Sequence, residues 1–176
     1  PGAVEETAIA VGHEHMILLS GSAPAGSWSP QNALSLADDE RRLLTMLYRN
    51  DPLFASALSE ADMLSQGSGR SDKRETGKTL ARFTADRLNG AARIAAFSIG
   101  GWDTHRRQDR AIVRPAAQLT DALTELRGRL GPNWDRTAVL AMTEFGRTAR
   151  ENGSQGTDHG TGGAMIVAGG YIAVRR

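Results

Sequence analysis

Three short segments in the last third of the chain carry side chains that can bind a metal ion or transfer protons. In order, they contain Asp103 and His105, Glu144 and Arg147, and Asp158 and His159. Each segment borders an apolar run typical of a β-strand, or lies in a glycine-rich stretch between two such runs. Because α/β proteins build their sites at the carboxyl ends of strands, we predict that the three segments contribute to one site.

Asp103 and His105 are two positions apart, just beyond a predicted strand. In extended backbone, residues i and i+2 point to the same side, so the carboxylate and the imidazole can converge on one cation. Mixed oxygen and nitrogen ligands suit zinc, manganese or iron, whereas calcium prefers oxygen alone. The alternative is an exposed turn in which Asp103 accepts hydrogen bonds from loop amides.

The other two segments offer further ligands and an anion-binding group. Glu144 is a candidate metal ligand or general acid/base, and Arg147 can hold a phosphate or sulfate through its planar guanidinium. Asp158 and His159 lie in a twelve-residue stretch, 152–163, with five glycines, which lets the backbone approach a ligand closely. The alternatives are an Arg–Glu surface pair for the second segment and an exposed surface loop for the third.

A second His-containing pattern, His13-Glu14-His15, would place both imidazoles on one side of a strand. It lies far from the other segments and has no glycine-rich partner loop, so we favour it less as a metal site. Ser98 and Ser154 lack the sequence context of a nucleophile elbow. A serine hydrolase is therefore not indicated.

The elements that must position these residues follow from the apolar spacing. Leucines at positions 119, 123, 126 and 130 give the clearest helix, which ends at Gly131-Pro132. Together the predicted helices span about 36–47, 51–64, 74–89 and 115–130, and the predicted strands span 92–99, 137–142 and 164–168. Strand, helix and strand from 92 to 142 form a βαβ unit, which predicts a parallel strand pair. The fold class is α/β, with a helix-rich part at 1–91 and a βαβ core at 92–176.

Composition narrows the range of functions. The 21 Lys+Arg residues nearly balance the 20 Asp+Glu residues, so a nucleic-acid partner is not indicated. The chain has no cysteine, which excludes disulfides and thiolate metal sites. No apolar run approaches the roughly 20 residues of a membrane span. The chain starts at Pro1 without a leader, and we expect a piece of a longer protein.

The three motifs also resemble a known family. Gly100-Gly-Trp-Asp-Thr-His105, the run from Trp134 to Thr148, and Glu151 to Gly160 follow one another as in an uncharacterised bacterial domain-of-unknown-function family, number 1501. That family is placed by resemblance in the alkaline phosphatase/sulfatase superfamily. The likeness covers about residues 92–170 and implies an α/β/α sandwich around a mainly parallel sheet. It further implies one or two divalent metals, with zinc, manganese and calcium left open, that bind a phosphate or sulfate ester.

By the same resemblance, Asp103, His105 and His159 look like metal ligands, and Glu144 stands where many relatives carry an Asp-His pair. Phe145 replaces a ligand histidine there, and the segment with the superfamily's nucleophile has no match. We therefore expect the C-terminal portion of a metal-dependent hydrolase, the alternative being a non-catalytic ligand- or protein-binding domain. The resemblance also implies twin-arginine export to the periplasm. An open sheet edge predicts a homodimer.

Overall fold

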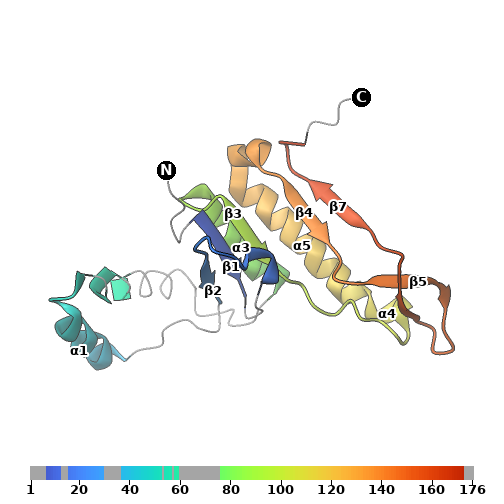
Figure 1. Ribbon diagram of the computed structural model, residues 1–176, viewed down its shortest axis with the longest axis horizontal. Helices are drawn as coiled ribbons and strands as arrows, with labels where there is room; N and C mark the ends of the chain where they lie inside the picture. The colour runs from blue at the N-terminus through green and yellow to red at the C-terminus, as the bar shows by residue number, and fades with distance from the viewer. Residues whose placement is uncertain are drawn as a thin grey trace.

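A computed structural model describes residues 7–12, 16–29, 37–52, 54–56, 58–59 and 76–172. The His13-Glu14-His15 pattern lies outside these residues. Within them, the protein is a mixed α/β structure with short strands in front of two packed helices (Figure 1). None of the described helices is long and apolar enough to cross a membrane.

The first sheet has three parallel strands in the order β2-β1-β3. They span Ala8–Val11 (β1), Gly26–Trp28 (β2) and Ile94–Phe97 (β3). Ile9 of β1 lies opposite Gly26 on one side and Ala95 on the other. Only β3 was predicted, because β1 is four residues long and β2 lies in a Gly/Ser/Pro-rich stretch that predicts a loop.

Two helices form the layer behind the strands, α3 (Gly77–Asn89) and α5 (Val113–Leu130). Thr76 caps α3, where its hydroxyl accepts a hydrogen bond from the Thr79 backbone N–H at 3.2 Å. A Cβ at Gly77 would meet the backbone oxygen of Gln118, so glycine is what allows the two helices to approach so closely.

Two groups of buried side chains make the core. One group lies between the helices and comprises Ala81, Ala85, Ala122, Leu126 and Leu130. The other joins α3 to the parallel sheet and comprises Ile9, Val11, Leu80 and Ala92. Trp134 and Val139 pack against the first group. Burial of these faces is the main force that fixes α3 and α5.

The remaining helices are shorter or lie apart. Helix α1 (Asp38–Tyr48) lies away from the sheet in Figure 1, and residues 52, 54–56 and 58–59 are also helical. Short 3-10 helices cover Ile17–Leu19 (η2) and Gly131–Arg136 (η4). A four-residue helix, α4 (Gln108–Ala111), precedes α5. Each of the four predicted helices therefore contains helical residues, with bounds that differ from the prediction by one or two residues where the structure describes them.

The prediction of a parallel βαβ pair is wrong in its pairing. Strand β4 (Val139–Met142) is antiparallel to β7 (Met165–Ala168), with Met142 opposite Met165. Strand β3 pairs with β1, and among the described residues it shares no ladder with β4. The reason is the connection after β4, a hairpin that reverses the chain and returns β7 beside β4 in the opposite direction.

That hairpin consists of β5 (Gly146–Glu151) and β6 (Thr157–Gly160), which are antiparallel. Its strands are polar and partly charged, so they lack the apolar alternation that identifies strands in sequence. The hairpin projects beyond the main body at the end where β3 leads into α4 (Figure 1). It therefore carries the third motif toward the first.

Candidate metal centre

The loop after β3 brings the first motif to the surface in a bent conformation. Gly101 adopts φ +96°, a left-handed conformation that favours glycine. The chain then places the Nε2 atom of His105 2.9 Å from Oδ1 of Asp103. The structure thus brings these two side chains together, but in a tight turn, in which Thr104 N–H donates to Trp102 O at 2.9 Å, and not in extended backbone.

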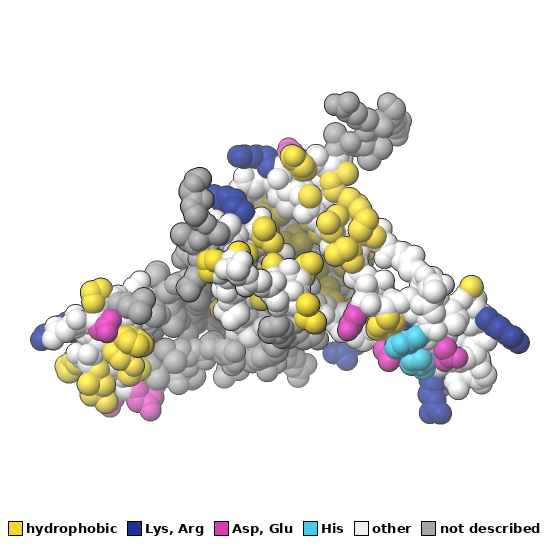
Figure 2. Space-filling model, viewed as in Figure 1, with side chains coloured by type: hydrophobic (Ala, Val, Ile, Leu, Met, Phe, Trp, Pro, Cys, Tyr) yellow, Lys and Arg dark blue, Asp and Glu magenta, His cyan; other side chains and the backbone are white. Residues whose placement is uncertain are grey.

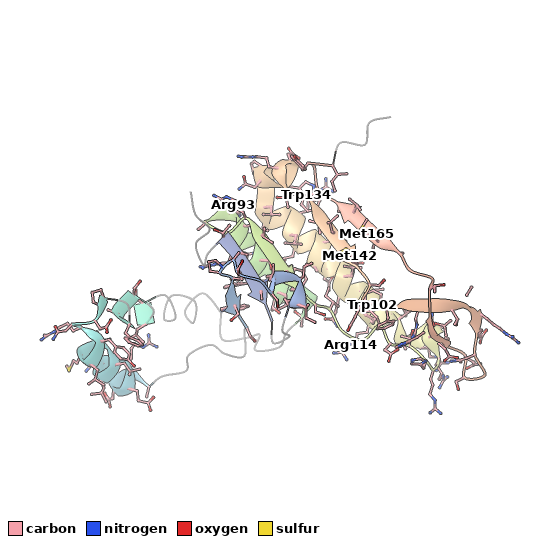
Figure 3. All side chains as sticks on the ribbon, in the orientation of Figure 1. Arg93, Trp102, Arg114, Trp134, Met142 and Met165 are labelled. Atoms are coloured by element: carbon pink, nitrogen blue, oxygen red, sulfur yellow. The ribbon has the colours of Figure 1, made fainter. Side chains whose placement is uncertain are left out.

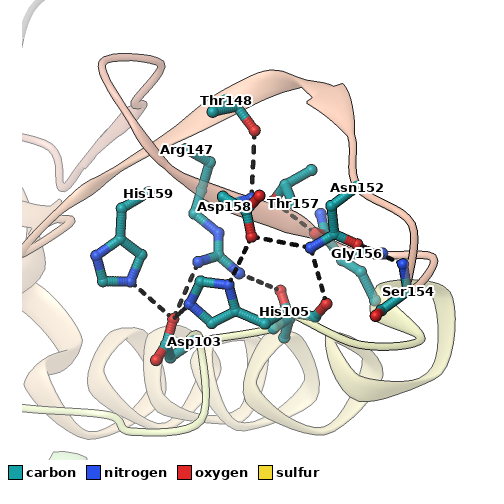
Figure 4. Close-up of polar contacts among 12 residues, drawn as sticks. Asp103, His105, Arg147, Thr148, Asn152, Ser154, Gly156, Thr157, Asp158 and His159 are labelled. Atoms are coloured by element: carbon teal, nitrogen blue, oxygen red, sulfur yellow. Dashed lines mark hydrogen bonds and ion pairs between the residues drawn. The ribbon is translucent and has the colours of Figure 1, made fainter.

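The hairpin supplies two more side chains to the same carboxylate (Figure 4). Arg147 of β5 and His159 of β6 are directly opposite each other in the ladder, so their side chains share a face. Nε2 of His159 lies 2.9 Å from Oδ1 of Asp103, and Nη1 of Arg147 donates to the same oxygen at 3.0 Å. Arg147 also donates from Nη2 to the buried hydroxyl of Thr104 at 3.1 Å.

Backbone contacts hold the hairpin loop against the first motif. Arg107 N–H donates to Ser154 O at 3.0 Å, and Gln108 N–H donates to Gln155 O at 2.8 Å. A Cβ at Gly156 would meet the backbone C and O atoms of His105, so only glycine fits there without a shift. Two segments that are distant in sequence are therefore held in register by the main chain.

Aromatic stacking fixes the second imidazole. The ring of Phe145 stacks on His159 with centroids 4.5 Å apart and planes 13° apart. The ring of His105 also stacks on that of His159, with centroids 5.0 Å apart. Phe145 thus packs against a histidine ring in this structure.

One ligand atom each from Asp103, His105 and His159 lies within 4.8 Å of the other two. A zinc ion with ligands at about 2.1 Å needs roughly 3.3 Å between them, close to the 2.9 Å between Asp103 and each imidazole. The three side chains are about half exposed, at 56%, 42% and 54%, so they have room for that adjustment. Two imidazoles and one carboxylate are also a donor set that zinc accepts.

Neighbouring side chains lower the pKa of two aspartates, Asp103 and Asp158. The hydrogen bond from His159 lowers the pKa of Asp103, with further lowering from the nearby His105 and Arg147 that outweighs desolvation. The hydrogen bond from Asn152 lowers the pKa of Asp158, and the bond from His105 adds to it. Asp158 accepts from Asn152 Nδ2 at 2.9 Å, and its Oδ1 lies 3.1 Å from Nδ1 of His105.

The predicted site residues therefore separate into groups. Asp103, His105 and His159 form the three-residue cluster, Arg147 contacts Asp103, and Asp158 contacts His105. Glu144, beyond the end of β4, is exposed and lies outside the three-residue cluster. Asn152 was not predicted, because an asparagine among glycines in sequence indicates only a loop.

Comparison with known families supports only part of the predicted identity. The sequence profile of a family described as "Protein of unknown function (DUF1501)" matches residues 35–174. The chain belongs to this family. Among the curated proteins and the solved structures, there is no significant match to the chain. The matched range includes the three-residue cluster together with Arg147 and Asp158, so the site is part of the family domain.

Proposed function

We propose that the chain binds one divalent metal ion through Asp103, His105 and His159. The observation that carries this proposal is the convergence of three potential ligand atoms within 4.8 Å. The ligands come from the loop after β3 and from β6, which the hairpin contacts hold together. The donor set favours zinc over calcium, because two of the three ligands are nitrogens.

We further propose that the metal site serves the hydrolysis of a phosphate or sulfate ester, within a fold of the alkaline phosphatase type. A bound ion would polarise the ester and stabilise developing negative charge. Arg147 is the residue placed to orient the anion, since its two contacts use only two of the five N–H donors of a guanidinium. Glu144, two residues beyond the end of β4, remains a candidate general acid/base.

A second candidate is a non-catalytic domain that uses the metal to bind a ligand or a partner. One observation favours it. Arg147 is only 18% exposed and is already bonded to Asp103 and Thr104, as an arginine with a purely structural role would be. Under this alternative the chain binds the ion, and no ester is turned over.

The proposal is tested by metal content, measured by mass spectrometry on protein purified without a metal-affinity column. We expect close to one ion per chain, and a lower Tm after chelation, since ligand at 100 times its Kd adds about 2.7 kcal/mol to stability. His105→Ala and His159→Ala should each weaken zinc binding by roughly tenfold or more, because each removes a ligand. Adding zinc back after chelation should restore the Tm of the wild type but not that of either variant.

The matched control is the double variant His13→Ala/His15→Ala. It removes two imidazoles that the sequence offers as a rival metal pair, and it should leave zinc content unchanged. A wild type with no metal and no response to chelator would refute the site. Stoichiometric metal without turnover of aryl phosphates or aryl sulfates would instead select the non-catalytic candidate.

A further inference from the structure

The ring of His105 lies between two carboxylates, one at each nitrogen (Figure 4). Nε2 is 2.9 Å from Oδ1 of Asp103, on the side of the proposed ion. Nδ1 is 3.1 Å from Oδ1 of Asp158, on the side of the hairpin loop. A neutral imidazole carries its proton on one nitrogen only, so whatever holds that proton decides which nitrogen can bind a metal.

Asp158 is itself held in place from two directions. Its Oδ1 accepts a hydrogen bond from Nδ2 of Asn152 at 2.9 Å, and its backbone N–H donates to the hydroxyl of Thr148 at 3.2 Å. The side chain of Asp158 is 61% exposed, so these contacts, and not burial, fix its orientation. An exposed carboxylate would otherwise sample several rotamers.

Asn152 connects the parts of this arrangement. Its Nδ2 also donates to the backbone oxygen of His105 at 3.0 Å. Its Oδ1 accepts from the backbone N–H groups of Ser154 and Gly156 at 2.9 and 3.1 Å. One amide side chain thus joins the loop, the main chain of His105 and the carboxylate that faces the ring.

We propose that Asp158 is a positioning residue for the metal centre, and that Asn152 holds it there. Asp158 accepts the Nδ1–H of His105, which leaves the Nε2 lone pair directed at the ion. The inference rests on the proposed metal binding and goes beyond it, because it gives Asp158 the role of orienting a ligand and not of being one. Carboxylates that orient metal-bound histidines in this way typically account for 10–100-fold in affinity.

The geometry distinguishes this role from direct ligation. Asp158 lies outside the three-residue cluster, while its Oδ1 already faces two nitrogen donors, Asn152 Nδ2 and His105 Nδ1. Moving that oxygen to the ion would break the contact with His105 Nδ1. The sequence pair Asp158-His159 suggests two adjacent ligands; the structure separates them into one ligand and one support.

The test measures zinc affinity by competition with a chromophoric chelator, and the His105 ring by nitrogen-15 NMR of the zinc-loaded protein. We expect Asp158→Ala to weaken zinc binding by about 10–100-fold and to abolish the downfield Nδ1–H resonance of His105. Asp158→Asn keeps an acceptor oxygen but loses the charge, so it should retain the Nδ1–H and lose less affinity. Asn152→Ala should fall between wild type and Asp158→Ala.

Asp109→Asn is the matched control, since it removes an exposed carboxylate near the site whose salt-bridge partner is Arg110 at 3.9 Å. Its zinc affinity should stay within about twofold of the wild type, as expected for an exposed ion pair. Equal zinc affinity and an unchanged ring spectrum in Asp158→Ala would overturn this inference and leave the metal site standing. A wild type that binds no zinc would overturn both.

Discussion

At Asp103, a single carboxylate oxygen faces three nitrogen atoms, from His105, His159 and Arg147. Because these contacts lower the pKa of Asp103, and the hydrogen bond from His159 contributes most, the side chain stays an anion in mildly acidic solution. Binding an ion there requires a free lone pair on each imidazole Nε2, so protons compete with the ion for these ligands. Metal affinity should therefore increase as the pH rises.

The glycine at position 156 gives a prediction at the residue scale. Gly156→Ala would push a Cβ into the backbone of His105. We therefore expect the loop between β5 and β6 to move away from His105. Overpacking of this kind costs about 1–3 kcal/mol, so Tm should fall by several degrees and zinc affinity should fall with it. Thermal denaturation and the chelator competition measure the two effects.

Gly153→Ala is the control for this substitution. It lies in the same loop, and a Cβ there would meet nothing within 4 Å. It should leave Tm and zinc affinity close to those of the wild type. Equal behaviour of the two variants would mean that the close contact at Gly156 does not determine the site.

How much of the site could be predicted differs from residue to residue. Asp103, His105 and His159 were predicted because ligand-type side chains near strand ends indicate a site by residue type alone. Their contact with one another depends on the hairpin, whose pairing of Arg147 with His159 has no local signature. The support from Asn152 and the stacking of Phe145 are tertiary contacts, so the sequence could not distinguish them from loop and core residues.

At the scale of elements, α3 and α5 are joined by a charged network as well as by their core. Glu125 accepts from Arg129 Nε at 2.7 Å and from Arg82 Nε at 3.2 Å, and Arg129 also donates to Asp86 at 2.9 Å. Burial alone would raise the pKa of Glu125, but the hydrogen bonds from the two arginines outweigh it and the pKa falls below 4.5. The network therefore stabilises the folded state when Glu125 is ionised.

This depressed pKa predicts a pH-dependent stability. The contribution of Glu125 is fully present above the unfolded-state value near 4.5 and is lost as the pH falls through the lower folded-state value. Glu125→Gln should lower stability at pH 7 by about 1 kcal/mol or less, because both arginines are more than one-third exposed. Melting curves should show the gap to wild type closing in acid.

Asp121→Asn, which removes an exposed carboxylate from the same helix, is the control and should show no comparable gap. A gap between Glu125→Gln and wild type that is constant down to acid pH would show that lost packing, and not charge, is responsible. The outcome separates the ion pairs from the apolar contacts that α3 and α5 also share.

The helices and the core strands could be predicted, but the strand partners could not. Leucine spacing in α5 reflects the buried face of that helix, which a sequence pattern reports directly. The compact apolar runs of β3, β4 and β7 identify them as strands by composition, although β4 and β7 are largely exposed. The antiparallel pairing of β4 with β7 depends on the polar hairpin between them. Because that hairpin carries no apolar alternation, a direct parallel crossover was the simpler interpretation and was wrong.

At the scale of the whole molecule, the β4–β7 pair presents an apolar face to solvent (Figure 2). The side chains are Leu140, Met142, Met165 and Val167, each between 43% and 57% exposed. Figure 3 shows Met142 and Met165 side by side on the two strands, as their register requires. Apolar patches of this kind in monomers mark interaction sites or promote association.

The homodimer predicted from the sequence remains a prediction, and this face is where a test should be made. Leu140→Lys would place a charge in the patch, and we expect it to reduce association by removing apolar contact. Sedimentation velocity across a concentration series measures the change. Leu18→Lys makes the same substitution at a 72% exposed leucine on η2, away from the patch, and is the control. A wild type that stays monomeric at every concentration would contradict the dimer.

The distance along the chain between the ligands has a consequence for how the domain is held together. His105 and His159 belong to the loop after β3 and to β6, with the whole of α5 and β4 between them. An ion shared by these residues would close that long loop as a disulfide does, in a chain that contains no cysteine. This cross-link would form or open with the supply of metal and would be indifferent to the redox state of its surroundings.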